Sequence, residues 1–405
     1  MKNDNAPLPS LRFKGFSEPW QEKTLGEIAE IVRGASPRPI QDPKWFDENS
    51  TVGWLRIADV TEQNGRIYHL EQKLSKLGQE KTRVLKEKHL LLSIAATVGK
   101  PVINYIEIGV HDGFIIFLNP KFNQEFMFQW LDMFKDKWKQ YGQPGSQINL
   151  NSDLVKNQTI LIPSLAEQEK IAGVLSAADE LISLQEQKIT ALKRHKQALM
   201  QQLFPANGES VPRLRFDGFS EPWQEKTLGE IGEIITGKTP DTKNSSLWNG
   251  DIQFVTPTDI KEDKYQVNTE RTIKNNIKYK ILPTKSIMFT CIGSTIGKIA
   301  LSVNECITNQ QINSIIPYNI FSNEFIYYSL FQKIPDIKSI ASSTAVPIIN
   351  KNEFSKLEIL VPSLAEQEKI AGVFSSADEL ISLHQQKLTT LKRHKQALMQ
   401  RLFPA

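Results

Sequence analysis

The sequence predicts an α+β fold with an internal pseudo-twofold repeat, in which two globular domains are separated by two long helices that form an antiparallel coiled coil. Three observations lead to this prediction. The string PSLAEQEKIAG occurs twice, starting at Pro163 and at Pro362. A second block of sequence recurs ahead of each copy, and an apolar pattern with alternating spacings of four and three follows each copy.

Composition limits the class of protein. The 405 residues exceed one ordinary domain, and 40% hydrophobic with 23% charged residues is typical of a globular chain. The N-terminus is polar and the longest apolar run, Leu90 to Val98, is too short for a membrane span, so we expect a cytoplasmic protein. Cys291 and Cys306 are expected to be core thiols. The net charge of +4 favours a polyanion partner only weakly.

The first repeated block is LRFKGFSEPWQEKTLGEI at residues 11–28, which returns as LRFDGFSEPWQEKTLGEI at 214–231. The segments that follow, 29–162 and 232–361, have diverged but keep matched landmarks in the same order. These are GASP and GKTP, the strand-like WLRIADV and FVTPTDI that both end on Asp, and AATVGK and GSTIGK. The pattern indicates two copies of one fold with different surfaces, as expected when loops on a rigid frame carry recognition.

The helical blocks run to Pro205 and Pro404, so we expect four segments: a domain at 1–162, a helix at 163–205, a domain at 206–361 and a helix at 362–405. Helices of this length need a long partner, and the other copy is the obvious candidate. Both pairing directions are open from sequence, but an antiparallel pair relates the repeats by a twofold. The predicted seam consists of Leu175, Ile182, Gln185, Ile189 and Leu192 in the first helix and Phe374, Ile381, His384, Leu388 and Leu391 in the second.

Polar residues at two matched positions interrupt each seam. We predict that Gln185 and His384 face each other and fix the register, with a ligand-binding His384 as the alternative. At the helix starts, Ser164 and Ser363 are expected N-caps, and Glu167 and Glu366 are placed to complete capping boxes.

No catalytic or metal-binding pattern is present. GSTIGK has the wrong glycine spacing for a phosphate-binding loop, and HExxH, GxSxG and dinucleotide fingerprints are absent. Asp59 and Asp259 are matched but isolated carboxylates, for which a structural hydrogen bond is the favoured role.

Local charge is more informative. Two basic tracts occupy corresponding places in the diverged segments, and we predict phosphate contacts for them, with a solvated lysine face as the alternative. The tract residues are Lys81, Arg83, Lys86, Lys88 and Lys100 in the first copy and Arg271, Lys274, Lys278, Lys280, Lys285 and Lys298 in the second. Further candidates for reading DNA are Arg38, Lys44, Trp45, Gln143, Ser146 and Gln147, and then Lys238, Lys243, Asn244, Trp248, Asn309, Gln310 and Gln311.

Taken in order, WQEKTLGEI, the Gly-x-Ser/Thr-Pro turn, the strand ending in Asp, GSTIGK and IPSLAEQEKIAGVLSAAD resemble the specificity subunit of type I restriction–modification systems. The resemblance covers nearly the whole chain. It implies a non-catalytic DNA-reading subunit with two target recognition domains, each reading one half of a split site, and two helices as a spacer. The first domain departs from the pattern, with AATVGK and VHDGF where the second has GSTIGK and TNQQI.

The resemblance also implies partners. These are double-stranded DNA, two adenine-methylating modification subunits and possibly two ATP-driven restriction subunits, which would use S-adenosylmethionine, ATP and Mg while this chain holds no cofactor. We expect a gap of about half a turn to one turn of DNA between the half-sites. The predicted docking residues for the modification subunits are Glu167, Gln168, Ile171, Glu366, Gln367 and Ile370. A protein-only scaffold and a specificity protein of a related restriction system outside type I are the alternatives.

Overall fold

The computed structural model describes residues 8–95, 97–138, 150–275, 279–341 and 348–404. The chain divides into two compact units, one made of Met1–Gln185 with Leu388–Ala405 and the other of Glu186–Lys387. Each unit therefore holds one diverged domain and parts of both long helices, so the units cut across the four segments expected from sequence. No helix in the described ranges has the length and apolar character needed to cross a membrane.

The first unit opens with the repeated leading block, which forms a small framework beside the first helix. Strand β1 (Gln21–Thr24) pairs antiparallel with β10 (Thr159–Ile162), and helix α1 (Leu25–Ile28) follows β1 directly. Helix α5 (Ser152–Asn157) packs against α1. The Glu27 carboxylate accepts a hydrogen bond from the Thr24 amide at 2.6 Å and so caps the start of α1.

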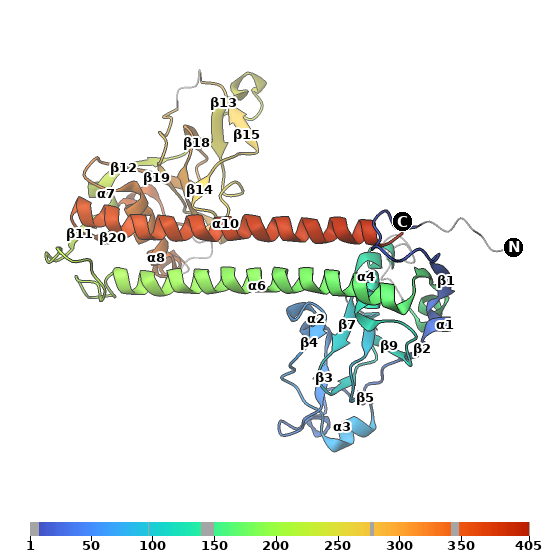
Figure 1. Cartoon of the computed structure of the whole chain (residues 1–405). Helices are drawn as coiled ribbons and strands as arrows, with labels where there is room; N and C mark the ends of the chain where they lie inside the picture. Colours follow the sequence, from blue (N-terminus) through green and yellow to red (C-terminus); the bar gives the residue numbers. More distant parts are fainter. Residues whose placement is uncertain (1–7, 96, 139–149, 276–278, 342–347, 405) are drawn as a thin grey trace. The chain divides into compact units, whose positions relative to one another are not determined.

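Two sheets build the recognition part of the first unit. The five-stranded sheet has the order β2 (Glu30–Arg33), β9 (Phe114–Leu118), β6 (Leu90–Ser93), β7 (Pro101–Asn104) and β4 (Arg66–Ile67). The three-stranded sheet has the order β3 (Gly53–Leu55), β8 (Ile108–Val110) and β5 (Arg83–Leu85). The short segments η1 (Pro43–Trp45), α2 (Ile57–Glu62) and α3 (Lys76–Glu80) complete it. Figure 1 shows β3, β5 and α3 at the end of this unit that is remote from α6.

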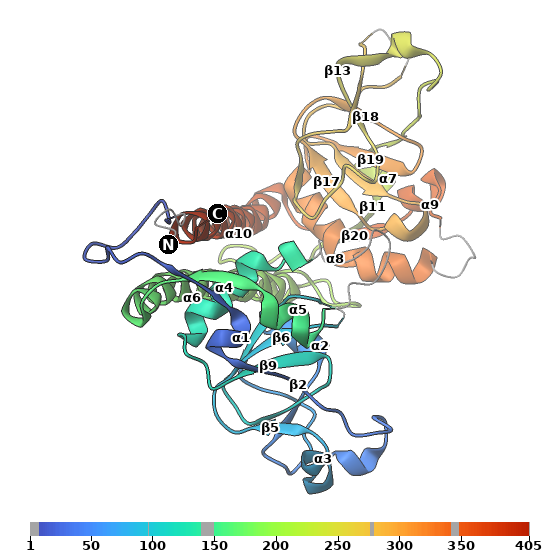
Figure 2. The ribbon, with the colours of Figure 1, turned by 90° about the vertical axis from the view of Figure 1, so that its right-hand side faces the viewer.

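Helix α4 (Gln124–Phe134) joins the five-stranded sheet to the first long helix, α6 (Leu165–Leu203). Figure 2 shows α4 next to α6, with the strands β6 and β9 below. Phe126 and Leu131 of α4 are fully buried in one cluster with strand and α6 residues. The turn before β7 packs against Trp138, because Gly99 has a positive φ of 83° and a Cβ there would lie 2.5 Å from the indole ring.

The second unit repeats the five-stranded sheet in the same strand order and builds its three-stranded sheet around a different central strand. Its five-stranded sheet runs β12 (Gly232–Thr236), β19 (Ile312–Pro317), β16 (Ile287–Thr290), β17 (Ile299–Ser302) and β14 (Tyr265–Gln266). Its three-stranded sheet runs β15 (Arg271–Ile273), β13 (Trp248–Val255) and β18 (Cys306–Thr308). The remaining elements are β11 (Gln224–Thr227), α7 (Leu228–Ile231), η3 (Ser245–Leu247), η4 (Gly293–Thr295), α8 (Asn323–Ala341), α9 (Lys351–Ser355) and β20 (Glu358–Val361). The predicted duplication of one fold is confirmed.

The long helices α6 and α10 (Leu364–Leu402) pack antiparallel, as predicted. In the first unit the start of α6, at Ile171 and Leu175, shares a core with Leu402 near the end of α10. In the second unit the end of α6, at Leu203, shares a core with Phe374 near the start of α10. This pairing of each start with the opposite end explains why the compact units contain pieces of both helices.

The predicted seam residues are the buried or half-buried ones of their helices. Leu175, Gln185, Ile189, Phe374 and Ile381 are buried, and Ile182, Leu192, His384, Leu388 and Leu391 are half-buried. The pairing of Gln185 with His384 would join the two units and stays a prediction. Among the described residues no group of His, Cys, Asp and Glu could hold a metal ion.

The two cysteines are free and buried, as expected for core thiols. Burial raises the pKa of Cys291 and of Cys306 to about 12, which keeps both thiols protonated near neutral pH. The matched carboxylates also have the expected structural role. The Asp59 carboxylate accepts from the Arg56 amide at 2.9 Å, and the Asp259 carboxylate accepts from the Thr256 amide at 2.8 Å.

Candidate nucleic-acid interface

The same pair of loops meets in both recognition domains, at the junction of the two sheets. In the first unit the amide of Ala35, after β2, donates to the carbonyl of Val110 at 3.0 Å. In the second unit the amide of Lys238, after β12, donates to the carbonyl of Thr308 at 2.8 Å. We call this contact between the loop after β2 or β12 and the loop after β8 or β18 the loop junction.

A glycine permits the close approach of the two loops in each unit. A Cβ at Gly34 would lie 2.2 Å from the carbonyl oxygen of His111, and a Cβ at Gly237 would lie 2.2 Å from that of Asn309. Neither distance is compatible with a side chain, so both positions require glycine. This requirement explains the shared glycine of the GASP and GKTP turns.

The first loop junction is charged. The Asp112 carboxylate accepts from the Ser36 hydroxyl at 2.9 Å and from the Arg38 guanidinium at 2.5 Å, while the Asp112 carbonyl accepts from Arg33 Nε at 2.6 Å. Burial by itself would raise the pKa of Asp112, but the Ser36 hydrogen bond and the neighbouring positive charges lower it. The Arg38 side chain is 69% exposed, so most of its donors face solvent.

His111 lies beside this junction, with its Nδ1 3.1 Å from the Asp112 carboxylate. Burial lowers the pKa of His111, and its Nδ1 accepts a hydrogen bond from the Gly113 amide at 2.9 Å. The ring also contacts Trp54, with ring centroids 5.7 Å apart. A hollow of about 420 Å³ opens next to it, lined in part by Trp54, Arg56 and Gln72. Neither His111 nor Asp112 was predicted from the sequence, and their only signal was the departure of VHDGF from the pattern of the second copy.

The side chains that form hydrogen bonds across the second loop junction are uncharged. The Gln310 side-chain oxygen accepts from the Thr239 hydroxyl at 2.6 Å, at the positions that correspond to Asp112 and Ser36. The Gln311 side-chain oxygen is held by the Asn309 amide group at 3.0 Å, which leaves Gln310 as the exposed amide. Lys238 projects over the Tyr279 ring with its ammonium 5.6 Å from the ring centroid.

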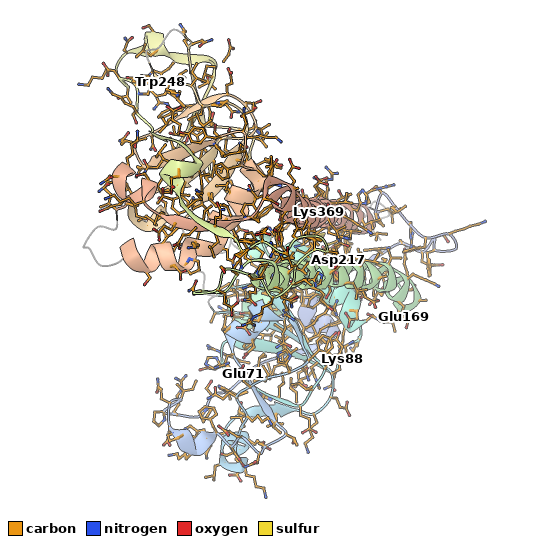
Figure 3. The ribbon with its side chains drawn as sticks, turned by 90° about the vertical axis from the view of Figure 1, so that its left-hand side faces the viewer. Glu71, Lys88, Glu169, Asp217, Trp248 and Lys369 are labelled. Atoms are coloured by element: carbon orange, nitrogen blue, oxygen red, sulfur yellow. The ribbon has the colours of Figure 1, made fainter. Side chains whose placement is uncertain are left out.

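The far end of each domain carries a cation above a tryptophan. Lys44 lies over the Trp45 ring at 4.5 Å, and the Arg271 guanidinium lies over the Trp248 ring at 3.5 Å. Each indole N–H donates to a carbonyl of the preceding loop, at 2.9 Å for Trp45 and 3.1 Å for Trp248. In Figure 3, Trp248 lies at the far end of the second unit from Lys369 of α10.

In the basic tracts some charged groups are bound by another group of the same domain, although Lys88, Lys280 and Lys285 are also exposed. Lys88 pairs with Glu125 and Lys100 with Asp132 of α4, at 2.6 and 3.7 Å. Lys298 donates to the Pro257 carbonyl at 2.8 Å. Lys280 pairs with Glu233 and Lys285 with Glu324. These five are therefore weaker candidates for phosphate contacts, because a carboxylate or a carbonyl already binds each charge.

The remaining basic candidates are exposed, and their DNA contacts stay predictions. They are Lys81, Arg83, Lys86, Lys238, Lys243, Arg271 and Lys274. Among them, Arg83 also donates from its Nε to the Arg33 carbonyl at 3.1 Å. Gln143, Ser146, Gln147 and Lys278 were also predicted to contact DNA and lie outside the described residues.

The predicted docking residues at the helix starts are buried inside their own units, which corrects the expectation that they form an exposed surface. The side chains of Glu167 and Glu366 are each 1% exposed. Glu167 accepts from Arg12 Nε at 2.8 Å, and Glu366 accepts from Arg215 Nε at 2.8 Å. The glutamate half of each predicted capping box is therefore wrong. Each glutamate binds an arginine of the leading block and not the start of its own helix.

The glutamines beside them connect two helices. Gln168 accepts from the Asn123 amide at 2.9 Å, at the start of α4, and donates to the Pro163 carbonyl at 2.8 Å. Gln367 makes the same two bonds to Ser322 and Pro362. Ile171 and Ile370, the remaining predicted docking residues, are buried in the cores of the two units. The repeated string is thus explained by internal packing in both units.

Two copies of one fold, with the same backbone junction but different exposed side chains at its tips, define a duplicated recognition protein. Comparison with known sequences also finds one domain in two copies. The sequence model of the type I restriction modification DNA specificity domain matches residues 17–194 and 220–393. The chain belongs to this family and carries its domain twice.

The similar proteins are specificity subunits of type I restriction enzymes. The specificity subunit of the type I restriction enzyme HindI of Haemophilus influenzae is 36% identical over 163 residues, 38% of this chain and 35% of that protein. A putative type I specificity subunit, MjaX, of Methanocaldococcus jannaschii is 23% identical across 94% of this chain and 92% of its own length. The matches to HindI and to the MjaIX specificity subunit cover only 35% and 38% of those relatives.

Solved structures show the same fold. The crystal structure of the type I restriction–modification S subunit from M. genitalium aligns over 98% of this chain and 99% of its own, with a TM-score of 0.64 at 15% identity. A chain from a study of complex assembly and conformational transition of the type I system aligns with a TM-score of 0.58 at 17% identity, over 96% of this chain and 98% of its own.

Proposed function

We propose that this chain is the non-catalytic, DNA-reading subunit of a type I restriction–modification enzyme, and that each recognition domain reads one half of a split site. The observation that carries this proposal is the loop junction. Its backbone is the same in both domains, while its tips carry Arg38 and Asp112 in one and Gln310 in the other. A fixed frame with different tips is suited to two different half-sites.

The exposed tips have donors and acceptors that match base edges. An arginine reads guanine through O6 and N7, and a glutamine reads adenine through N6 and N7. Arg38 keeps free donors after its bond to Asp112, and Gln310 keeps its amide group after its bond from Thr239. The exposed lysines and arginines of the tracts would hold the phosphate backbone and fix the position of each domain.

The partners would be two modification subunits that methylate adenine with S-adenosylmethionine, and two restriction subunits that use ATP and Mg. Because the helix starts are buried, we assign docking to an exposed apolar face that recurs on both helices. Leu181 and Leu184 of α6 are 56% and 54% exposed, and Leu380 and Leu383 of α10 are 41% and 61% exposed. Matched apolar faces on equivalent helices are suited to two copies of one partner.

The docking face gives a direct test. Changing Leu181 and Leu184 together to lysine should abolish binding of one modification subunit and leave the melting temperature unchanged, since both side chains face solvent. Size-exclusion chromatography with light scattering would detect the loss, and changing Glu180 to lysine on the same helix is the control. A complex that keeps both modification subunits would contradict this assignment.

The proposed function is tested by coexpressing the chain with a type I modification subunit and mapping methylated adenines in a random DNA library. A split, asymmetric motif with a gap of about half a turn to one turn is expected. Unmodified DNA and no salt-dependent DNA binding would favour the protein-only scaffold. A methylated motif with partners of another kind would favour a related system outside type I.

A further inference from the structure

One aspartate on each long helix is bound both by the other long helix and by its own recognition domain. Asp179 lies on α6 and Asp378 occupies the equivalent position on α10. Both carboxylates are partly buried, at 25% and 24% exposure. Each accepts hydrogen bonds from its own recognition domain and from the other long helix, so we call each set of contacts a clamp.

In the first unit the two oxygens of Asp179 have different partners. Oδ1 accepts from Lys395 of α10 at 2.5 Å. Oδ2 accepts from Gln129 of α4 at 2.6 Å and from Arg66 of β4 at 3.4 Å. The carboxylate therefore links the partner helix through one oxygen and the recognition domain through the other.

The second unit repeats the division with different donors. Oδ1 of Asp378 accepts from Lys196 of α6 at 2.5 Å, and Oδ2 accepts from the Tyr328 hydroxyl of α8 at 2.7 Å. Lys264, next to β14, donates to the Tyr328 hydroxyl at 3.1 Å and to Ser375 of α10 at 2.9 Å. Tyr328 of α8 corresponds to Gln129 of α4, so the domain side of the clamp has changed while the helix side has not.

The clamps explain one of the two matched interruptions of the seam. Lys196 and Lys395 occupy seam positions where an apolar residue is expected, and their side chains are only 15% and 13% exposed. A buried lysine needs a carboxylate partner, and a shift of one helix by a single turn would leave it without one. Polar residues at such positions specify register and orientation in coiled coils.

We propose that Asp179 and Asp378 are positioning residues, which fasten each recognition domain to the helix pair in one register and thereby set the gap that the protein accepts between half-sites. This inference rests on the proposed function. A recognition domain that diverges must therefore keep a hydrogen-bond donor at the position of Gln129 or Tyr328, with a cation beside it.

The test measures gap selection rather than overall activity. The chain and its modification subunit are assayed for methylation of DNA in which the two half-sites are kept and the gap is lengthened or shortened by single base pairs. The variants are Lys196→Met, which removes the helix side of one clamp, and Tyr328→Phe, which removes only a hydroxyl from the domain side. Lys193→Met, an exposed change one turn away on α6, is the control.

Each clamp variant should lower the preference for the correct gap over its neighbours by roughly tenfold, the factor carried by one hydrogen bond to a charged group. The control should keep the preference. A general loss of stability would lower methylation equally at all gaps and leave the ratio unchanged, which would overturn the inference. Tyr328→Phe retains the ring in its aromatic cluster, so this variant stays informative if Lys196→Met fails to fold.

The outcome for the unaltered chain separates the two proposals. If the wild-type complex methylates no split site, the proposed function fails. If it methylates a split site with a fixed gap and the clamp variants select that gap as sharply as the wild type, only the positioning role fails.

Discussion

The two loop junctions share a backbone and differ in chemistry. In the first unit a carboxylate at Asp112 binds a hydroxyl and a guanidinium, and in the second an amide at Gln310 binds a hydroxyl alone. The glycine that permits each contact is unchanged. The difference indicates that the backbone of the junction belongs to the fold, while its exposed side chains can be replaced as the target changes.

The buried helix starts behave in the opposite way. Arg12 with Glu167 and Arg215 with Glu366 have the same geometry in both units, with Nε to Oε1 distances of 2.8 Å. Each arginine also donates to the carbonyl of a glutamate in its own leading block. The helix starts are therefore the same in both units while the tips of the loop junctions differ, and the following predictions test that division.

The largest expected effect is at the arginine–glutamate pair that both units share. Glu167→Ala and Glu366→Ala should each lower the free energy of unfolding by about 3 kcal/mol, because removal of the carboxylate leaves a largely buried guanidinium without its partner. Urea denaturation of the two variants would measure this loss. A difference of more than about 1 kcal/mol between them would break the equivalence of the two units.

The glycines of the loop junction come next. Gly34→Ala and Gly237→Ala should each cost about 2 kcal/mol, since the added methyl group would overlap a carbonyl oxygen. Each should also reduce methylation that depends on its own half-site. Gly173→Ala on α6 is the control, because no atom lies within 4 Å of its added Cβ, and it should stabilise the chain by about 1 kcal/mol.

The exposed tips should affect specificity rather than folding. Arg38→Ala should weaken methylation roughly tenfold and relax base preference in the first half-site only, and Gln310→Ala should do the same in the second. Substrates with single-base changes in either half-site would show which half has lost its preference. Relaxation of both half-sites by one variant would contradict the separate roles of the two domains.

The smallest effect concerns pH. Burial lowers the pKa of His111, so between pH 7 and 5 the unfolded chain takes up a proton that the folded chain does not. Stability of the first loop junction should thus fall by less than about 1 kcal/mol as the pH falls through this range. Hydrogen exchange after β8 should increase relative to exchange after β18, where Asn309 does not titrate. The variant His111→Asn should remove the difference.

Much of the architecture could be predicted because repetition makes it visible in one sequence. Matched landmarks such as Gly34 with Gly237 showed that two diverged segments share one fold, and the alternating spacing around Leu175 and Phe374 located the helix seam. Glu167 and Gln168, which were predicted to be docking residues, are buried in the fold. A repeated string is equally expected from a shared partner and from shared internal packing. Only burial distinguishes these two causes.

The sequence by itself determined that this protein has two equivalent halves, two long helices and different exposed chemistry in each half, since these follow from local periodicity and from alignment of one half with the other. Tertiary structure decided which residues face solvent and which pair across long distances in the chain. Arg12 meets Glu167 and Lys395 meets Asp179 only when the fold is complete. The reason is physical. The sequence does not show whether a charged side chain is solvated or paired, because its partner is brought close only by the fold.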